Sequence, residues 1–100
     1  MKKLADISEL NLKTEPKVGE ELILEIIGYL RDAAWKLEPE KIQYSPESFF
    51  IEIKLYANRD PSLMAAQVIK GFQKKIPLVF SKKGKWTVKC NTKSIEVKIE

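Results

Sequence analysis

Apolar residues recur at spacings of three and four between residues 18 and 37, which is the spacing of one face of a helix. The positions are Val18, Leu22, Ile23, Ile26, Ile27, Leu30, Ala33, Ala34 and Leu37. Glu20 and Glu21 suit the positive end of a helix, and Pro39 would stop it. The pattern therefore predicts a long helix, although β-branched isoleucines beside Gly28 are also compatible with a short strand.

A second, shorter helix is predicted to begin at Asp60-Pro61, because aspartate caps helices well and proline is tolerated in the first turn. Lys74, Lys75 and Pro77 mark its end. Its apolar stripe consists of Leu63, Met64, Val68, Ile69 and Phe72. We expect this stripe to be buried against the rest of the domain.

Between these segments the apolar residues alternate with polar ones, which is typical of half-buried strands. A turn around Pro46 separates residues 41–44 from residues 49–57, and the two pieces form a predicted hairpin. In the second piece the core-facing set is Phe49, Ile51, Ile53 and Leu55, and the outward-facing set is Phe50, Glu52, Lys54 and Tyr56.

The C-terminal third is predicted to be a meander of strands. A strand at residues 85–90 and another at residues 94–99 are joined by a turn at residues 91–93, and a short extra strand is expected near Leu78. The side chains expected to face inward are Trp86, Val88, Cys90, Ile95, Val97 and Ile99. Those expected to face outward are Lys85, Thr87, Lys89, Glu96 and Lys98.

Together these elements predict an α+β fold with two helices packed on one face of a four- to five-stranded antiparallel sheet, in the order α-β-β-α-β-β. One hundred residues is the size of a single domain that folds without a disulfide or a metal. We place this domain at residues 16–100. Residues 1–15 are expected to form an N-terminal arm or a short element, either a helix or an edge strand.

The chain carries no sign of export. No apolar run approaches the roughly 18 residues of a membrane span, and the first residues lack a secretory signal. A single cysteine, Cys90, cannot form an intramolecular disulfide. We therefore expect a cytoplasmic protein. Direct membrane contact is not expected, because it would need a basic amphipathic helix and the predicted long helix is acidic.

The residue types also disfavour catalysis. The chain has no histidine, which removes the commonest general base near neutral pH. The four glycines stand apart, so neither a dinucleotide-binding fingerprint nor a P-loop is present. Cys90 falls at an inward-facing position that suits a small core residue. We expect a non-enzymatic protein with no catalytic residue, cofactor, metal site or small-molecule substrate.

The net charge of +4 hides an uneven distribution. Residues 1–69 carry nine basic and 12 acidic side chains, whereas residues 70–100 carry nine lysines and only two glutamates. Lysines two apart on a strand lie about 7 Å from one another and can follow a phosphate backbone, while exposed rings can stack on bases. The predicted nucleic-acid-binding residues are Lys74, Lys75, Lys82, Lys83, Lys85, Lys89, Lys93, Phe50 and Tyr56.

We therefore predict a small nucleic-acid-binding protein that contacts phosphates with little sequence preference, because lysine predominates over arginine. The sequence does not distinguish DNA from RNA or single from double strands. The alternative is a protein-interaction or structural subunit with no nucleic-acid role, which forms a homodimer through the outer face of the sheet.

Overall fold

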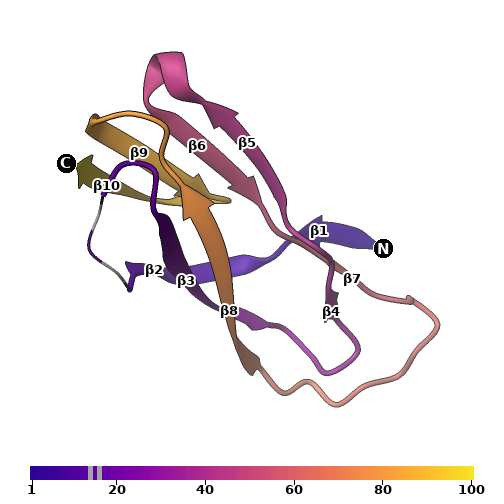
Figure 1. Cartoon of the computed structure of the whole chain (residues 1–100). Helices are drawn as coiled ribbons and strands as arrows, with labels where there is room; N and C mark the ends of the chain where they lie inside the picture. The colour runs from indigo at the N-terminus through magenta and orange to yellow at the C-terminus, as the bar shows by residue number, and fades with distance from the viewer. Residues whose placement is uncertain (14, 16) are drawn as a thin grey trace.

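The computed structural model describes residues 1–100 except 14 and 16, and its regular structure is almost entirely β-strand (Figure 1). In chain order the elements are β1 (Lys2–Leu4), β2 (Asp6–Leu12), β3 (Glu21–Leu30), β4 (Lys36–Leu37), β5 (Lys41–Ser45), the 3-10 helix η1 (Pro46–Ser48), β6 (Phe50–Lys54), β7 (Tyr56–Asn58), β8 (Lys70–Val79), β9 (Gly84–Cys90) and β10 (Lys93–Ile99). The described residues contain no α-helix, so the predicted α+β fold is wrong.

The strands form three sheets in an elongated molecule that measures 49 × 22 × 18 Å. A four-stranded sheet has the order β10-β9-β6-β5, and a three-stranded sheet has the order β2-β3-β8. These two sheets share one hydrophobic core, and a small third sheet, β1-β7-β4, adjoins them. Strands β6 and β9 run parallel, so the predicted wholly antiparallel sheet is also wrong.

The predicted helix at residues 18–37 is instead the long strand β3, followed by a turn and the short strand β4. Leu22, Leu24 and Ile26 are all fully buried, which is the period of two that a strand requires. Leu22, Ile26 and Leu30 are also spaced by four, so they satisfy the helical pattern equally well. Strand β3 lies between β2 and β8, and pairing on both edges overrides local helix preference.

The predicted helix after Asp60 does not form either. Residues 59–69 connect β7 to β8 with one turn at Pro61–Ser62, and β8 then pairs with β3 over ten residues. Phe72, expected on the helix, is half-buried on β8. Leu63, Met64, Val68 and Ile69, expected in the core, are exposed. Pairing with β3 therefore makes the second half of the predicted helix part of strand β8. The first half of the predicted helix is left without a surface on which to pack.

The strands predicted from alternation and turns are largely confirmed. Strands β5 and β6 pair antiparallel as a hairpin, and β9 pairs antiparallel with β10. The segment near Leu78 lies at the end of β8 rather than in a separate strand. Of the six side chains predicted to face inward from β9 and β10, all are buried except Ile95, which is half-buried.

Trp86 is the largest side chain at the centre of the core, where it is fully buried. Its ring makes edge contacts with Phe49 and Phe80, at centroid distances of 5.5 and 5.1 Å. The indole Nε1 donates a hydrogen bond to the Lys82 carbonyl at 3.0 Å. Its polar atom is therefore satisfied inside an apolar environment.

The N-terminal residues are part of the sandwich. Strand β2 is an edge strand that pairs with β3, with a bulge between Ile7 and Glu9. The two strands approach closely at Gly28, where an added Cβ would lie 2.2 Å from the Asp6 carbonyl oxygen. Glycine is therefore required at this crossing for steric reasons. Residues 14 and 16, which belong to the predicted arm and domain start, lie outside the described residues.

Candidate nucleic-acid interface

Strands β5, β6, β9 and β10 present one polar surface on the side of their sheet that faces away from the core. Residues that are register partners point to the same side, so the strand pairing fixes its membership. The surface, which we call the lysine face, consists of Lys41, Gln43, Ser45, Phe50, Glu52, Lys54, Lys85, Thr87, Lys89, Ser94, Glu96 and Lys98. It carries five lysines and two glutamates.

Two pairs of lysines lie directly opposite one another on this face. Lys41 is the register partner of Lys54, and Lys85 is the register partner of Lys98. Like charges at directly opposed positions destabilise a sheet. Each pair therefore concentrates positive charge at one place on the lysine face.

The two lysine pairs differ in how far they are neutralised. Lys85 contacts Glu96 at 3.0 Å and Lys98 contacts Glu100 at 3.6 Å, but all four side chains are strongly exposed, and such pairs are weak. Within the described part of the chain, neither Lys41 nor Lys54 has an ion pair with a carboxylate. The Lys41–Lys54 pair is therefore the stronger candidate for binding an anion.

The five lysines run diagonally across the sheet. Lys98 and Lys85 occupy one corner, Lys89 lies in the middle beside Glu52, and Lys54 and Lys41 occupy the opposite corner. With strands about 4.8 Å apart and about 7 Å per two residues, the diagonal is about 25 Å long. A track of this length can contact several successive phosphates of an extended chain.

Tyr56 lies at the end of this track, on β7, just beyond the break in the strand at Leu55. The ammonium groups of Lys2 and Lys41 lie 4.7 and 5.7 Å from the centre of its ring. A shallow hollow of about 400 Å³ opens beside it, lined by Lys41, Ile42, Gln43, Glu52, Lys54 and Tyr56. An aromatic ring flanked by two lysines, of which Lys2 also contacts Glu38 at 3.1 Å, thus closes the Lys41 end of the lysine face.

The structure brings together only some of the residues that the sequence predicted for the site. Lys85, Lys89 and Phe50 lie on the lysine face, and Tyr56 lies at its end. Lys93 begins β10 at the β9–β10 turn, but its register partner is the core-facing Cys90, so it does not belong to the lysine face.

The remaining predicted lysines lie elsewhere. Lys74 and Lys75 belong to β8 in the other sheet, where Lys74 contacts Glu40 at 3.6 Å. Lys82 lies in the β8–β9 turn, with its ammonium group 4.2 Å from the centre of the Phe49 ring. Lys83 lines a hollow that also contains three carboxylates, those of Glu15, Glu20 and Glu100. These four lysines do not join the lysine face.

Lys41 is a member of the face that the sequence prediction missed. It alternates with Ile42 along β5, so the period of two that placed Lys54 and Lys98 on the outer side also applies to it. The lysines predicted for the site all belong to the basic C-terminal third, and Lys41 lies outside it. Lys2, also missed, reaches the site only through the β1–β7 pairing, which no local pattern reveals.

The structure explains the shifted pKa values of two buried groups, Glu25 and Cys90. Glu25 is buried on β3, where desolvation raises its pKa, but hydrogen bonds from Lys13 and Gln73 outweigh this effect and lower it. The Lys13 ammonium group lies 3.2 Å from its carboxylate. Burial raises the pKa of Cys90 to about 11, so this thiol stays protonated near neutral pH. Neither group has the environment of an activated base or nucleophile.

The described residues contain neither a cluster of potential metal ligands nor a helix that could span a membrane. No three histidine, cysteine, aspartate or glutamate side chains among them gather as metal ligands. In the same part of the chain, no helix has the length and apolar character needed to cross a membrane.

Comparison with known proteins agrees with the strand architecture. The model of the ORF11 beta-sandwich domain family matches residues 24–100, a range that includes every strand of the lysine face and begins inside β3. No curated protein and no solved structure matches the chain. Since the family model covers well over half of the sequence, the chain belongs to the ORF11 beta-sandwich domain family.

Proposed function

We propose that this protein is a non-enzymatic module that binds single-stranded nucleic acid along the lysine face. The observation that carries the proposal is the direct opposition of Lys41 and Lys54, with no carboxylate paired to either within the described residues. A phosphate between the two ammonium groups would replace their repulsion with two attractive contacts.

The composition of the face favours a nucleic acid over a simple polyanion. Phe50 lies near the middle of the face and Tyr56 at one end, where their rings are able to stack on unpaired bases. Glu52 and Glu96 lie between the lysines, where they would repel phosphates but accept hydrogen bonds from base amino groups. A single strand offers both phosphates and exposed bases to such a surface, whereas a duplex keeps its bases stacked.

The alternative function is a homodimer that forms through the same face. The charge of the lysine face argues against a homodimer. Two copies of a face with five lysines and two glutamates would place positive charge against positive charge. Sedimentation over a concentration series tests this alternative. If the face is the dimer seam, Phe50→Glu should dissociate the dimer.

We expect the quadruple variant Lys41→Gln, Lys54→Gln, Lys85→Gln, Lys89→Gln to lose most of its affinity for single-stranded DNA. Each lost phosphate contact removes a released counterion, so the slope of log affinity against log salt should fall by about 3. Fluorescence anisotropy with a labelled oligothymidylate, measured from low to moderate salt, gives both the affinity and the slope.

A matched control carries the same change in net charge at lysines outside the face: Lys17→Gln, Lys70→Gln, Lys75→Gln, Lys83→Gln. It should keep the wild-type slope. If both variants lose affinity equally, binding depends on net charge alone and not on the lysine face. Absence of binding by the wild type at low salt would refute the proposed function itself.

A further inference from the structure

The loop of residues 59–69, which connects β7 to β8, exposes an unusual amount of apolar surface. Met64 is 99% exposed, Ile69 68%, Val68 62% and Leu63 51%. These four side chains make up half of the eight large hydrophobic residues that the described part of the chain exposes. Figure 1 shows the loop as an arc that extends beyond the strands it connects. Exposed apolar residues concentrated on one loop indicate a contact site.

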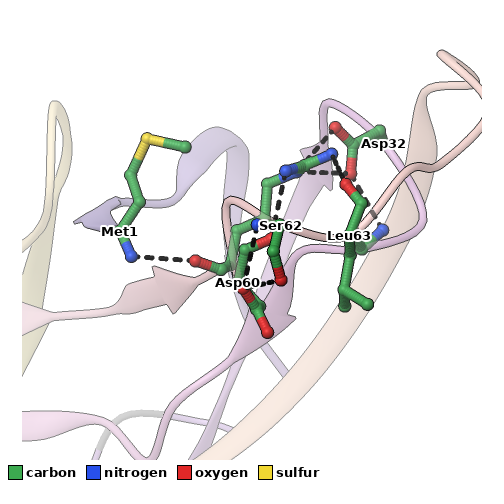
Figure 2. A network of polar contacts seen from close by, with 7 residues as sticks. Met1, Asp32, Asp60, Ser62 and Leu63 are labelled. Carbon is green, nitrogen blue, oxygen red and sulfur yellow. Dashed lines mark hydrogen bonds and ion pairs between the residues drawn. The ribbon is translucent and has the colours of Figure 1, made fainter.

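The start of this loop is firmly held, as Figure 2 shows. The Arg59 guanidinium group donates to both Asp32 carboxylate oxygens, at 3.1 and 3.3 Å. It also donates to the carbonyls of Asp60 and Leu63 at 3.2 and 3.1 Å. The N-terminal amine of Met1 donates to the Arg59 carbonyl at 2.8 Å. The apolar residues after Leu63 therefore extend from a fixed base.

The same base has the geometry of a helix start. The Asp60 carboxylate accepts hydrogen bonds from the backbone N–H and the hydroxyl of Ser62, at 2.9 and 2.7 Å. The Leu63 N–H donates to the Asp60 carbonyl at 3.1 Å. Residues 63–67 are Leu, Met, Ala, Ala and Gln, which favour helix. The segment thus begins with a cap and continues with helix-favouring residues. An apolar surface would supply the packing that a short helix needs for stability.

The charge of the segment indicates which kind of surface would stabilise this helix. Residues 61–75 contain three lysines and no acidic residue. One of these lysines, Lys70, is exposed where the loop joins β8, as the first residue of that strand. An uncharged apolar segment that ends at an exposed lysine is complementary to the boundary between acyl chains and anionic headgroups of a lipid bilayer.

We propose that the 59–69 loop is an anchor for anionic lipid surfaces. Met64, Val68 and Ile69, which a helix would place on one side, enter the interfacial region, residues 61–69 fold into a short amphipathic helix there, and Lys70 contacts headgroups. The sequence-based expectation of no membrane contact depended on an acidic helix at residues 18–37, and the structure has no helix in that segment. The proposal does not depend on the lysine face, because the loop belongs to other strands.

Vesicle co-sedimentation tests the proposal with the full chain. We expect binding to phosphatidylcholine vesicles that contain phosphatidylserine, with part of the binding retained at high salt. The triple variant Met64→Ser, Val68→Ser, Ile69→Ser should bind at least about tenfold more weakly, because its apolar contribution is lost. These side chains are exposed, so the thermal midpoint should stay close to that of the wild type. Circular dichroism should show a gain of helix when the wild type binds vesicles.

The control variant Leu4→Ser, Tyr44→Ser, Val79→Ser removes exposed apolar side chains from other elements and should bind vesicles like the wild type. Three results would overturn the proposal. The first is no vesicle binding by the wild type, and the second is equal binding by the wild type and the loop variant. The third is a wild-type dimer in sedimentation velocity that only the loop variant dissociates, which would assign the loop to a second copy of the chain.

Discussion

Replacing Trp86 with alanine is expected to lower the free energy of unfolding by about 4 kcal/mol, the usual cost of removing a large aromatic side chain from a core. Trp86 is fully buried and contacts Phe49 and Phe80 by ring edges. Its removal would leave a cavity in a close-packed core, which cannot collapse freely. Urea unfolding followed by far-UV circular dichroism measures the change.

The variant Trp86→Phe separates packing from hydrogen bonding. It keeps an aromatic ring in the site but removes the Nε1 donor to the Lys82 carbonyl, so we expect a loss of about 2 kcal/mol. If Trp86→Ala is unfolded without denaturant, the phenylalanine variant still gives a measurable value. A loss below about 1 kcal/mol for alanine would contradict the central position of Trp86 in the core.

Replacing Asn91 with alanine is expected to cost about 3 kcal/mol, because it leaves buried backbone groups without partners. The Asn91 Nδ2 donates to the carbonyls of Ala5 and Leu55, at 2.8 and 2.9 Å, and its Oδ1 accepts from the Leu55 N–H at 3.0 Å. Ala5 and Leu55 are buried, at 4% and 0% exposure. Asn91 also has a left-handed backbone, with φ of 54°, which disfavours alanine.

Two variants test whether Asn91 acts through these hydrogen bonds. Asn91→Asp keeps the acceptor for the Leu55 N–H but places a carboxylate against two carbonyls, so its stability should rise when low pH protonates the carboxylate. The control Asn58→Ala changes an exposed asparagine whose one side-chain contact, with Glu38, is 3.5 Å long, and it should change stability by less than about 0.5 kcal/mol. If Asn91→Ala and Asn58→Ala lower the free energy of unfolding equally in urea, the hydrogen bonds of Asn91 do not stabilise the fold as proposed.

Asn91 also illustrates what a sequence pattern can and cannot reveal. The residue is correctly predicted to lie in the turn between two strands, because turn residues and alternation are local signals. Its contacts with Ala5 and Leu55 join segments 86 and 36 residues away. Such contacts depend on how the sheets pack together, and the residues next to Asn91 in the sequence do not predict them.

The failure of the two predicted helices has a specific physical origin. A spacing of four satisfies both a helix and a strand, so Leu22, Ile26 and Leu30 could not distinguish them, and only the burial of Leu24 does. At Asp60 the carboxylate accepts a hydrogen bond from the Ser62 N–H, but no helix follows, because β8 pairs with β3 over ten residues and includes Phe72. In both segments, pairing between distant strands decided the outcome rather than local propensity.

The candidate site was only partly predictable for related reasons. Alternation along β6, β9 and β10 placed Lys54, Lys89 and Lys98 on the outer side correctly. The parallel pairing of β6 with β9, which sets Glu52 beside Lys89, has no local signal. The opposition of Lys41 and Lys54 requires the hairpin register, and a turn that includes η1 does not fix that register from sequence alone.

Binding of nucleic acid along the lysine face can be located by NMR titration of the ¹⁵N-labelled protein with a short oligothymidylate. We predict that amide shift changes concentrate on β5, β6, β9 and β10, with the largest near Lys54, Lys89 and Tyr56. Shift changes confined to β8 or to the turn at Lys82 and Lys83 would place the binding site elsewhere, and the absence of shift changes at low salt would show that the protein does not bind this ligand.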